Sequence, residues 1–167
     1  LLASAILVAE LWARAQFADA PPAPRPTPLI LPHELVQPDP LVGVHFVPNA
    51  SKFVESPHNE FKVNSQINEL VLRDLGMLAS GTKQPIVLAL GNSAIEGWGV
   101  MPEATFLLEM QRRLRFQKGA TIYPRILNAG MTGFGAAQAY LLGRKLIDDV
   151  KPKVIIFGYS SLMPAAD

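Results

Sequence analysis

The second half of the chain alternates strand-like and helix-like segments, and this order leaves few architectures open. Residues 85–90, 125–130 and 153–160 are short runs rich in branched apolar residues, as is typical of strands covered on both faces. Between them, residues 102–117 and 135–150 carry apolar side chains at helical spacing. Strands joined by single helices require right-handed crossovers and a parallel sheet. We therefore predict an α/β fold with a parallel sheet.

Small and polar residues follow each of the three predicted strands. They occupy positions 91–93, 128–130 and 158–161. In an open parallel sheet, ligands bind beyond the carboxyl ends of the strands, and these ends meet at one edge. We therefore expect the three clusters to form a single site, with a serine, Ser93, at its mouth.

These segments, within residues 84–162, resemble the conserved blocks of the SGNH or GDSL hydrolases, which are esterases on a three-layer, flavodoxin-like parallel sheet. The stretch LGNSAIEGWGV resembles the first block, with Ser93 at the position of the nucleophile and Asn92 in place of an aspartate. Gly91 and Gly97 belong to the same turn. The resemblance implies that Ser93 would attack an ester carbonyl.

The second and third blocks carry the implied oxyanion hole. LNAGMTGFGAAQ resembles the second block, in which the backbone N–H of Gly130 would join that of Ser93. KPKVIIFGYSSL resembles the third block, with Ser160 or Ser161 where the family has an asparagine donor. Loss of one oxyanion donor typically lowers the rate about 10²- to 10³-fold. The altered third block therefore predicts weakened catalysis.

A catalytic base is the second requirement for a serine nucleophile. The resemblance implies a histidine that follows an aspartate near the C-terminus, but His33, His45 and His58 all precede Ser93. None of these histidines has the spacing of a metal site, and we predict no metal or cofactor. Ser93 can also have a structural role, as the cap of a helix, with the glycines serving only a tight turn.

Residues 1–20 begin with nine almost entirely apolar residues, which predicts the outer end of a membrane-anchor helix with Trp12 at the headgroup level. An amphipathic surface helix and the remnant of a signal peptide are the alternatives. The chain starts without methionine inside this apolar run and stops shortly after the third strand. We interpret it as a piece of a longer protein, with a truncated α/β domain over residues 84–167.

Two further segments separate the predicted anchor from the α/β domain. Residues 21–50 hold nine of the fifteen prolines. Proline fixes φ and removes a donor, so we predict an extended polyproline strap or linker, whose apolar runs contact a membrane-protein partner. Residues 51–83 are predicted to be a helical connector, because apolar residues recur at helical spacing within residues 61–80.

Charge and motifs restrict the function. Fifteen basic residues against fourteen acidic ones, without a basic run interleaved with aromatics, argue against nucleic acid as a partner. A nucleotide-binding module is disfavoured, because residues 127–138 lack the Gly-x-Gly-x-x-Gly spacing. We predict a membrane-anchored, extracytoplasmic (periplasmic) SGNH-like domain that is catalytically impaired and serves as a structural subunit of a membrane assembly. The alternative is an active serine esterase or acyltransferase, acting for example on acetylated glycans, with its Asp-His pair beyond residue 167.

Overall fold

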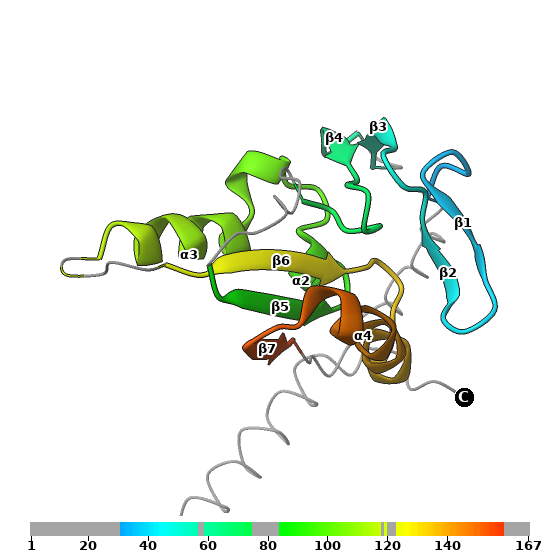
Figure 1. Cartoon of the computed structure of the whole chain (residues 1–167). Helices are drawn as coiled ribbons and strands as arrows, with labels where there is room; N and C mark the ends of the chain where they lie inside the picture. The colour runs from blue at the N-terminus through cyan, green and yellow to red at the C-terminus, as the bar shows by residue number, and fades with distance from the viewer. Residues whose placement is uncertain (1–30, 57–58, 75–83, 118, 120–122, 159–167) are drawn as a thin grey trace, which may run out of the picture.

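A three-stranded parallel sheet lies at the centre of the computed structural model, which describes residues 31–56, 59–74, 84–117, 119 and 123–158 (Figure 1). The strand order is β6-β5-β7, and the strands are β5 (Ile86–Gly91), β6 (Arg125–Gly130) and β7 (Val154–Phe157). Both pairings are parallel, with Ala89 of β5 opposite Asn128 of β6 and Ile156 of β7. The predicted α/β fold with a parallel sheet is confirmed.

Helices cover both faces of this sheet. The helical segments are α2 (Ser93–Glu96), the 3-10 helix η1 (Pro102–Ala104), α3 (Phe106–Arg115) and α4 (Ala136–Val150). Leu88 of β5 packs in one apolar cluster with Leu142 of α4, whereas Val87 packs in another with Leu107 of α3. Because successive residues of a strand point to opposite faces, α3 and α4 lie on opposite sides of the sheet.

The proline-rich region contains a β-hairpin. Strands β1 (Val36–Asp39) and β2 (Gly43–Phe46) pair antiparallel, and their apolar residues join the core cluster of the parallel sheet. The prediction of an extended strap over residues 21–50 is therefore wrong for residues 36–46. Pro38 is tolerated because β1 belongs to a two-stranded sheet, in which each strand is an edge. A membrane-protein partner for residues 21–50 stays a prediction.

A second hairpin occupies part of the predicted helical connector. Strands β3 (Ser51–Glu55) and β4 (Lys62–Gln66) pair antiparallel, so the helix predicted within residues 61–80 is wrong for β4. Val63, Ser65 and Ile67 are buried at alternate positions. The buried residue at the middle position is a polar serine, and this hides the two-residue period from a reading of the apolar residues alone.

The chain after β4 forms a tight loop instead of a helix. The Asn68 Oδ1 accepts hydrogen bonds from the backbone N–H groups of Leu70 at 2.9 Å and Leu72 at 3.0 Å. Val71 between them has a φ of 59°, in the left-handed region. A side chain that bonds its own backbone in this way competes with helix formation. Residues 75–83 lie outside the described ranges.

The predicted anchor helix over residues 1–20 also lies outside the described residues. Within the ranges that are described, no helix has both the length and the apolar character needed to cross a membrane. Membrane anchoring therefore stays a prediction from the sequence.

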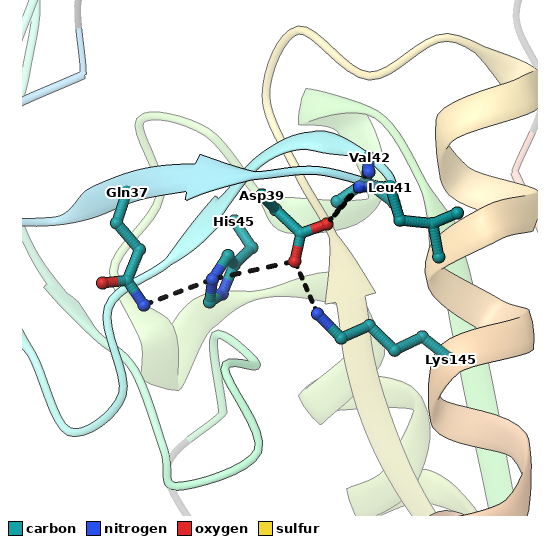
Figure 2. A network of polar contacts seen from close by, with 6 residues as sticks. All are labelled: Gln37, Asp39, Leu41, Val42, His45 and Lys145. Carbon is teal, nitrogen blue, oxygen red and sulfur yellow. Dashed lines mark hydrogen bonds and ion pairs between the residues drawn. The ribbon is translucent and has the colours of Figure 1, made fainter.

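Asp39 joins the first hairpin to α4 (Figure 2). Its Oδ1 accepts from the backbone N–H groups of Leu41 at 2.8 Å and Val42 at 3.0 Å, and its Oδ2 lies 2.5 Å from the Lys145 Nζ. The Lys145 hydrogen bond, followed by that from Val42, lowers the pKa of Asp39 from its ordinary value of 3.8 to about 2. The side chain of Asp39 is only 4% exposed, so the carboxylate is held almost entirely by the protein.

The ionised form of Asp39 should make stability depend on pH. A lowered pKa contributes stability that is present above pH 3.8 and is lost as the pH falls through about 2. Because the Lys145 ammonium is partly exposed and screened, we expect Asp39→Asn to lower the free energy of unfolding by about 1 kcal/mol at neutral pH. Thermal unfolding of both proteins, followed by circular dichroism, should show that the difference in stability between Asp39→Asn and the wild type decreases as the pH falls toward about 2. Parallel pH profiles of the two proteins would contradict this role.

Candidate functional site

The predicted nucleophile lies in a tight turn between β5 and the chain after α2, residues 91–100, which we call the serine turn. Ser93 is the first residue of the single-turn helix α2. Its carbonyl oxygen accepts from the backbone N–H groups of Gly97 and Trp98, both at 3.0 Å. Gly97 then ends the helix in a left-handed conformation, with a φ of 80°. Ser93 is thus presented at the carboxyl end of a parallel strand.

The cap of α2 is Asn92 and not Ser93. The Asn92 Oδ1 accepts from the backbone N–H of Ala94 at 3.0 Å. Ser93 is partly exposed, and its hydroxyl makes no hydrogen bond with the residues that the structure describes. The capping role that the sequence allowed for Ser93 therefore belongs to its neighbour Asn92.

Glycines let α2 lie very close to the sheet. A Cβ on Gly91 would lie 2.5 Å from the Cγ1 of Ile95 and 2.9 Å from the carbonyl oxygen of Gly158. A Cβ on Gly130, at the end of β6, would overlap the backbone nitrogen of Glu96. A larger residue at Gly130 would displace the backbone of α2, and one at Gly91 would displace the Ile95 side chain and the backbone of Gly158.

Gly130, the second predicted oxyanion donor, lies beside α2. Its backbone N–H donates to the Oδ1 of Asn128 at 3.0 Å, so this donor already has an acceptor within the strand end. The Nδ2 of Asn128 donates in turn to the carbonyl oxygen of Glu96 at 3.1 Å. Asn128 thus holds α2 against β6, Gly130 leaves the space for α2, and the oxyanion role of Gly130 stays a prediction.

A buried acid lies at the end of α2. Glu96 is 2% exposed, and its Oε2 accepts from the backbone N–H of Thr132 at 2.5 Å. Burial raises the pKa of Glu96, against the opposing effects of the Thr132 hydrogen bond and of the Arg73 charge. Sequence reasoning missed this residue, although a glutamate three positions after the serine, between an isoleucine and a glycine, was visible in GNSAIEGWG.

Arg73 is the second residue that sequence reasoning missed. It lies in the loop after β4, is 4% exposed, and donates to the backbone carbonyl oxygens of Glu96, Gly97 and Val100. Burial lowers the pKa of the Arg73 guanidinium, against the attraction of the Glu96 carboxylate. Its position in VLRD, within an apolar run, was the available signal.

The histidines with described positions have other neighbours than Ser93. His33 lies beside Glu34 with its side chain 94% exposed, and the Nε2 of His45 lies 3.2 Å from the Nε2 of Gln37. His58 lies outside the described residues, as do Ser160 and Ser161, so their places relative to Ser93 are not given. Within the described ranges, no group of three or more acidic or histidine side chains could hold a metal ion.

Comparison with known proteins gives structural neighbours only. No family model matches the chain, and no curated protein does. The chain is similar to the crystal structure of AlinE4, an SGNH-hydrolase family esterase, with 25% identity and a TM-score of 0.40. A mutant of the same esterase gives 22% identity and a TM-score of 0.40. Each match covers 47% of this chain and 41% of the esterase, so the chain spans less than half the length of these neighbours.

The close approach of α2 to β6 can be tested with two glycine variants. A methyl group at Gly130 meets the backbone of Glu96, so we expect Gly130→Ala to lower the free energy of unfolding by about 3 kcal/mol. Gly143 in α4 is the matched control, because its added Cβ would meet only the end of the Leu90 side chain, 2.5 Å away. Alanine also favours the helix there, so Gly143→Ala should cost about 1 kcal/mol or less. Urea unfolding measures both, and equal costs would contradict the backbone contact.

Proposed function

We propose that the chain carries a serine ester hydrolase or acyltransferase site of the SGNH type, with Ser93 as the nucleophile. One observation carries the proposal: Asn92 caps α2, while the partly exposed Ser93 hydroxyl makes no hydrogen bond with the described residues. This hydroxyl stands just beyond the carboxyl end of β5, at the edge where parallel sheets bind ligands. A serine hydroxyl that the described residues leave without a hydrogen bond at such a place is suited to a substrate.

The proposed chemistry is acyl transfer. The Ser93 hydroxyl attacks the carbonyl carbon of an ester while a base takes its proton, and the carbonyl oxygen becomes an oxyanion. The oxyanion collapses and the ester C–O bond breaks, so that the alcohol leaves with the proton from the base; water or a second alcohol then releases the acyl group from Ser93. The backbone N–H of Ser93, at the first turn of α2, has no partner within the helix and can donate to this oxyanion. Ser160 or Ser161 would add a hydroxyl donor. In this proposal the base comes from residues outside the described ranges, and an acetylated glycan is a suitable substrate.

The test of Ser93 is covalent labelling of the full-length protein with a fluorophosphonate, which reacts with activated serines. We expect stoichiometric labelling of the wild type and none of Ser93→Ala, while Ser51→Ala, an exposed serine on β3, labels like the wild type. Peptide mass spectrometry locates the label. A folded wild-type protein that takes up no label would sink the proposal.

The second candidate is the structural subunit: a membrane-anchored, extracytoplasmic domain with impaired catalysis. The exposed apolar surface of β7 favours it, because Val154, Ile155 and Phe157 are 53%, 47% and 42% exposed. Strands of parallel sheets are normally covered on both faces, so this surface suits contact with further protein. The apolar composition of residues 1–9 supports the anchor.

This candidate predicts retention in membranes. We expect the full-length protein to resist alkaline extraction and a variant without residues 1–20 to be released, because the apolar segment would hold it in the bilayer. In size-exclusion chromatography, the detergent-solubilised wild type should elute together with a membrane protein. The Phe157→Lys variant should elute without that protein. Release of the wild type by alkali would exclude the anchor. Elution of the solubilised wild type without any membrane protein would exclude the subunit role.

A further inference from the structure

We infer that Arg73 is the positioning residue of the Ser93 nucleophile, an inference that rests on the proposed function. Arg73 lies outside residues 84–162, in the loop that follows β4, yet its guanidinium reaches the serine turn. Its Nη1 donates to the carbonyl oxygens of Glu96 at 2.8 Å and Gly97 at 2.9 Å, and its Nη2 donates to that of Val100 at 2.6 Å. Arg73 therefore holds the end of the serine turn and of α2, the helix that Ser93 begins.

The chemistry of the turn requires a donor with several N–H groups. A helix leaves its last carbonyl groups without partners, and α2 is only four residues long. The planar guanidinium offers five donors in a fixed fork, and here the Nε is also used, donating to the Ser65 hydroxyl at 3.1 Å. An ammonium group is a point charge that cannot reproduce this geometry. Arg73→Lys keeps the positive charge and removes the fork of donors, so it tests this geometry most directly.

The loop that carries Arg73 is itself fixed on both sides. Before it, Asn68 binds the backbone of Leu72, and Val71 holds a left-handed conformation that a branched residue adopts only when its surroundings impose it. After it, Asp74 forms an ion pair with Arg125 at the start of β6. The guanidinium therefore extends from a loop with little freedom to move.

The held end of the turn is coupled directly to the nucleophile. The backbone N–H groups of Gly97 and Trp98 donate to the Ser93 carbonyl oxygen, so a shift of residues 96–98 moves the serine. The Trp98 ring also meets Phe61 edge to face, with centroids 5.4 Å apart. A displacement of about 1 Å at a reacting group can lower a rate about 100-fold. By holding residues 96–98, Arg73 therefore controls the reactivity of Ser93.

The test measures serine reactivity at matched stability in the full-length protein. Arg73→Lys is compared with Lys145→Met, which removes the Asp39 contact between the first hairpin and α4, and each variant is assayed at a temperature where it is fully folded. We expect fluorophosphonate labelling and kcat for p-nitrophenyl acetate to fall at least about tenfold in Arg73→Lys, with KM little changed, and to stay within about twofold in Lys145→Met. Added guanidinium should partly restore Arg73→Ala.

The outcomes separate the two proposals. If Arg73→Lys labels as fast as Lys145→Met, the positioning role is overturned while the serine chemistry stands. If the wild type does not label, the proposed function fails. Amide hydrogen exchange of residues 94–100 then tests whether Arg73 holds the serine turn. Faster exchange in Arg73→Lys than in Lys145→Met at equal stability supports the role of Arg73 in holding the turn, and equal exchange overturns it.

Discussion

Buried polar groups must find partners within the protein, and the serine turn depends on this constraint. The carbonyl oxygen of Glu96 accepts from both Arg73 and Asn128, and its carboxylate accepts from the backbone of Thr132. The donors come from three places in the sequence: the loop after β4, the end of β6 and the segment that leads into α4. Because removal of one partner leaves a buried group unsatisfied, the three segments are held in one arrangement around α2.

Both N-terminal hairpins are linked to the α/β domain by polar contacts. Asp39 holds the first hairpin to α4 through Lys145, and Arg73 and Asp74 reach α2 and β6 from the loop after the second. These contacts cross residue 84, where the change to alternating strand-like and helix-like segments predicted that the α/β domain begins. Through Arg73, the serine turn uses residues on both sides of that boundary, so the loop after β4 belongs to the physical description of the site.

The elements predicted correctly from the sequence are those whose apolar residues form a continuous run or recur at helical spacing. β5, β6, α3 and α4 occur close to where the apolar runs and helical spacing indicated. β4 was missed because Ser65, a buried polar residue, interrupts the alternation of apolar residues; the Arg73 Nε satisfies its hydroxyl. The hairpin at β1 was missed because Pro38 argues against a strand, although an edge strand tolerates proline.

The same distinction separates the predicted from the unpredicted parts of the candidate site. A local motif was enough to place Ser93 at the end of a strand, since the turn is encoded by neighbouring residues. The capping alternative was assigned to Ser93, whereas the cap is Asn92; serine and asparagine are equally good caps, so residue type alone does not separate the two. Arg73 lies 23 positions before Glu96; the apolar run around it is a signal of its burial, but nothing in one sequence identifies its hydrogen-bond partner. The position of the nucleophile is thus encoded locally, whereas the rigidity on which its reactivity would depend arises only when the layers pack together.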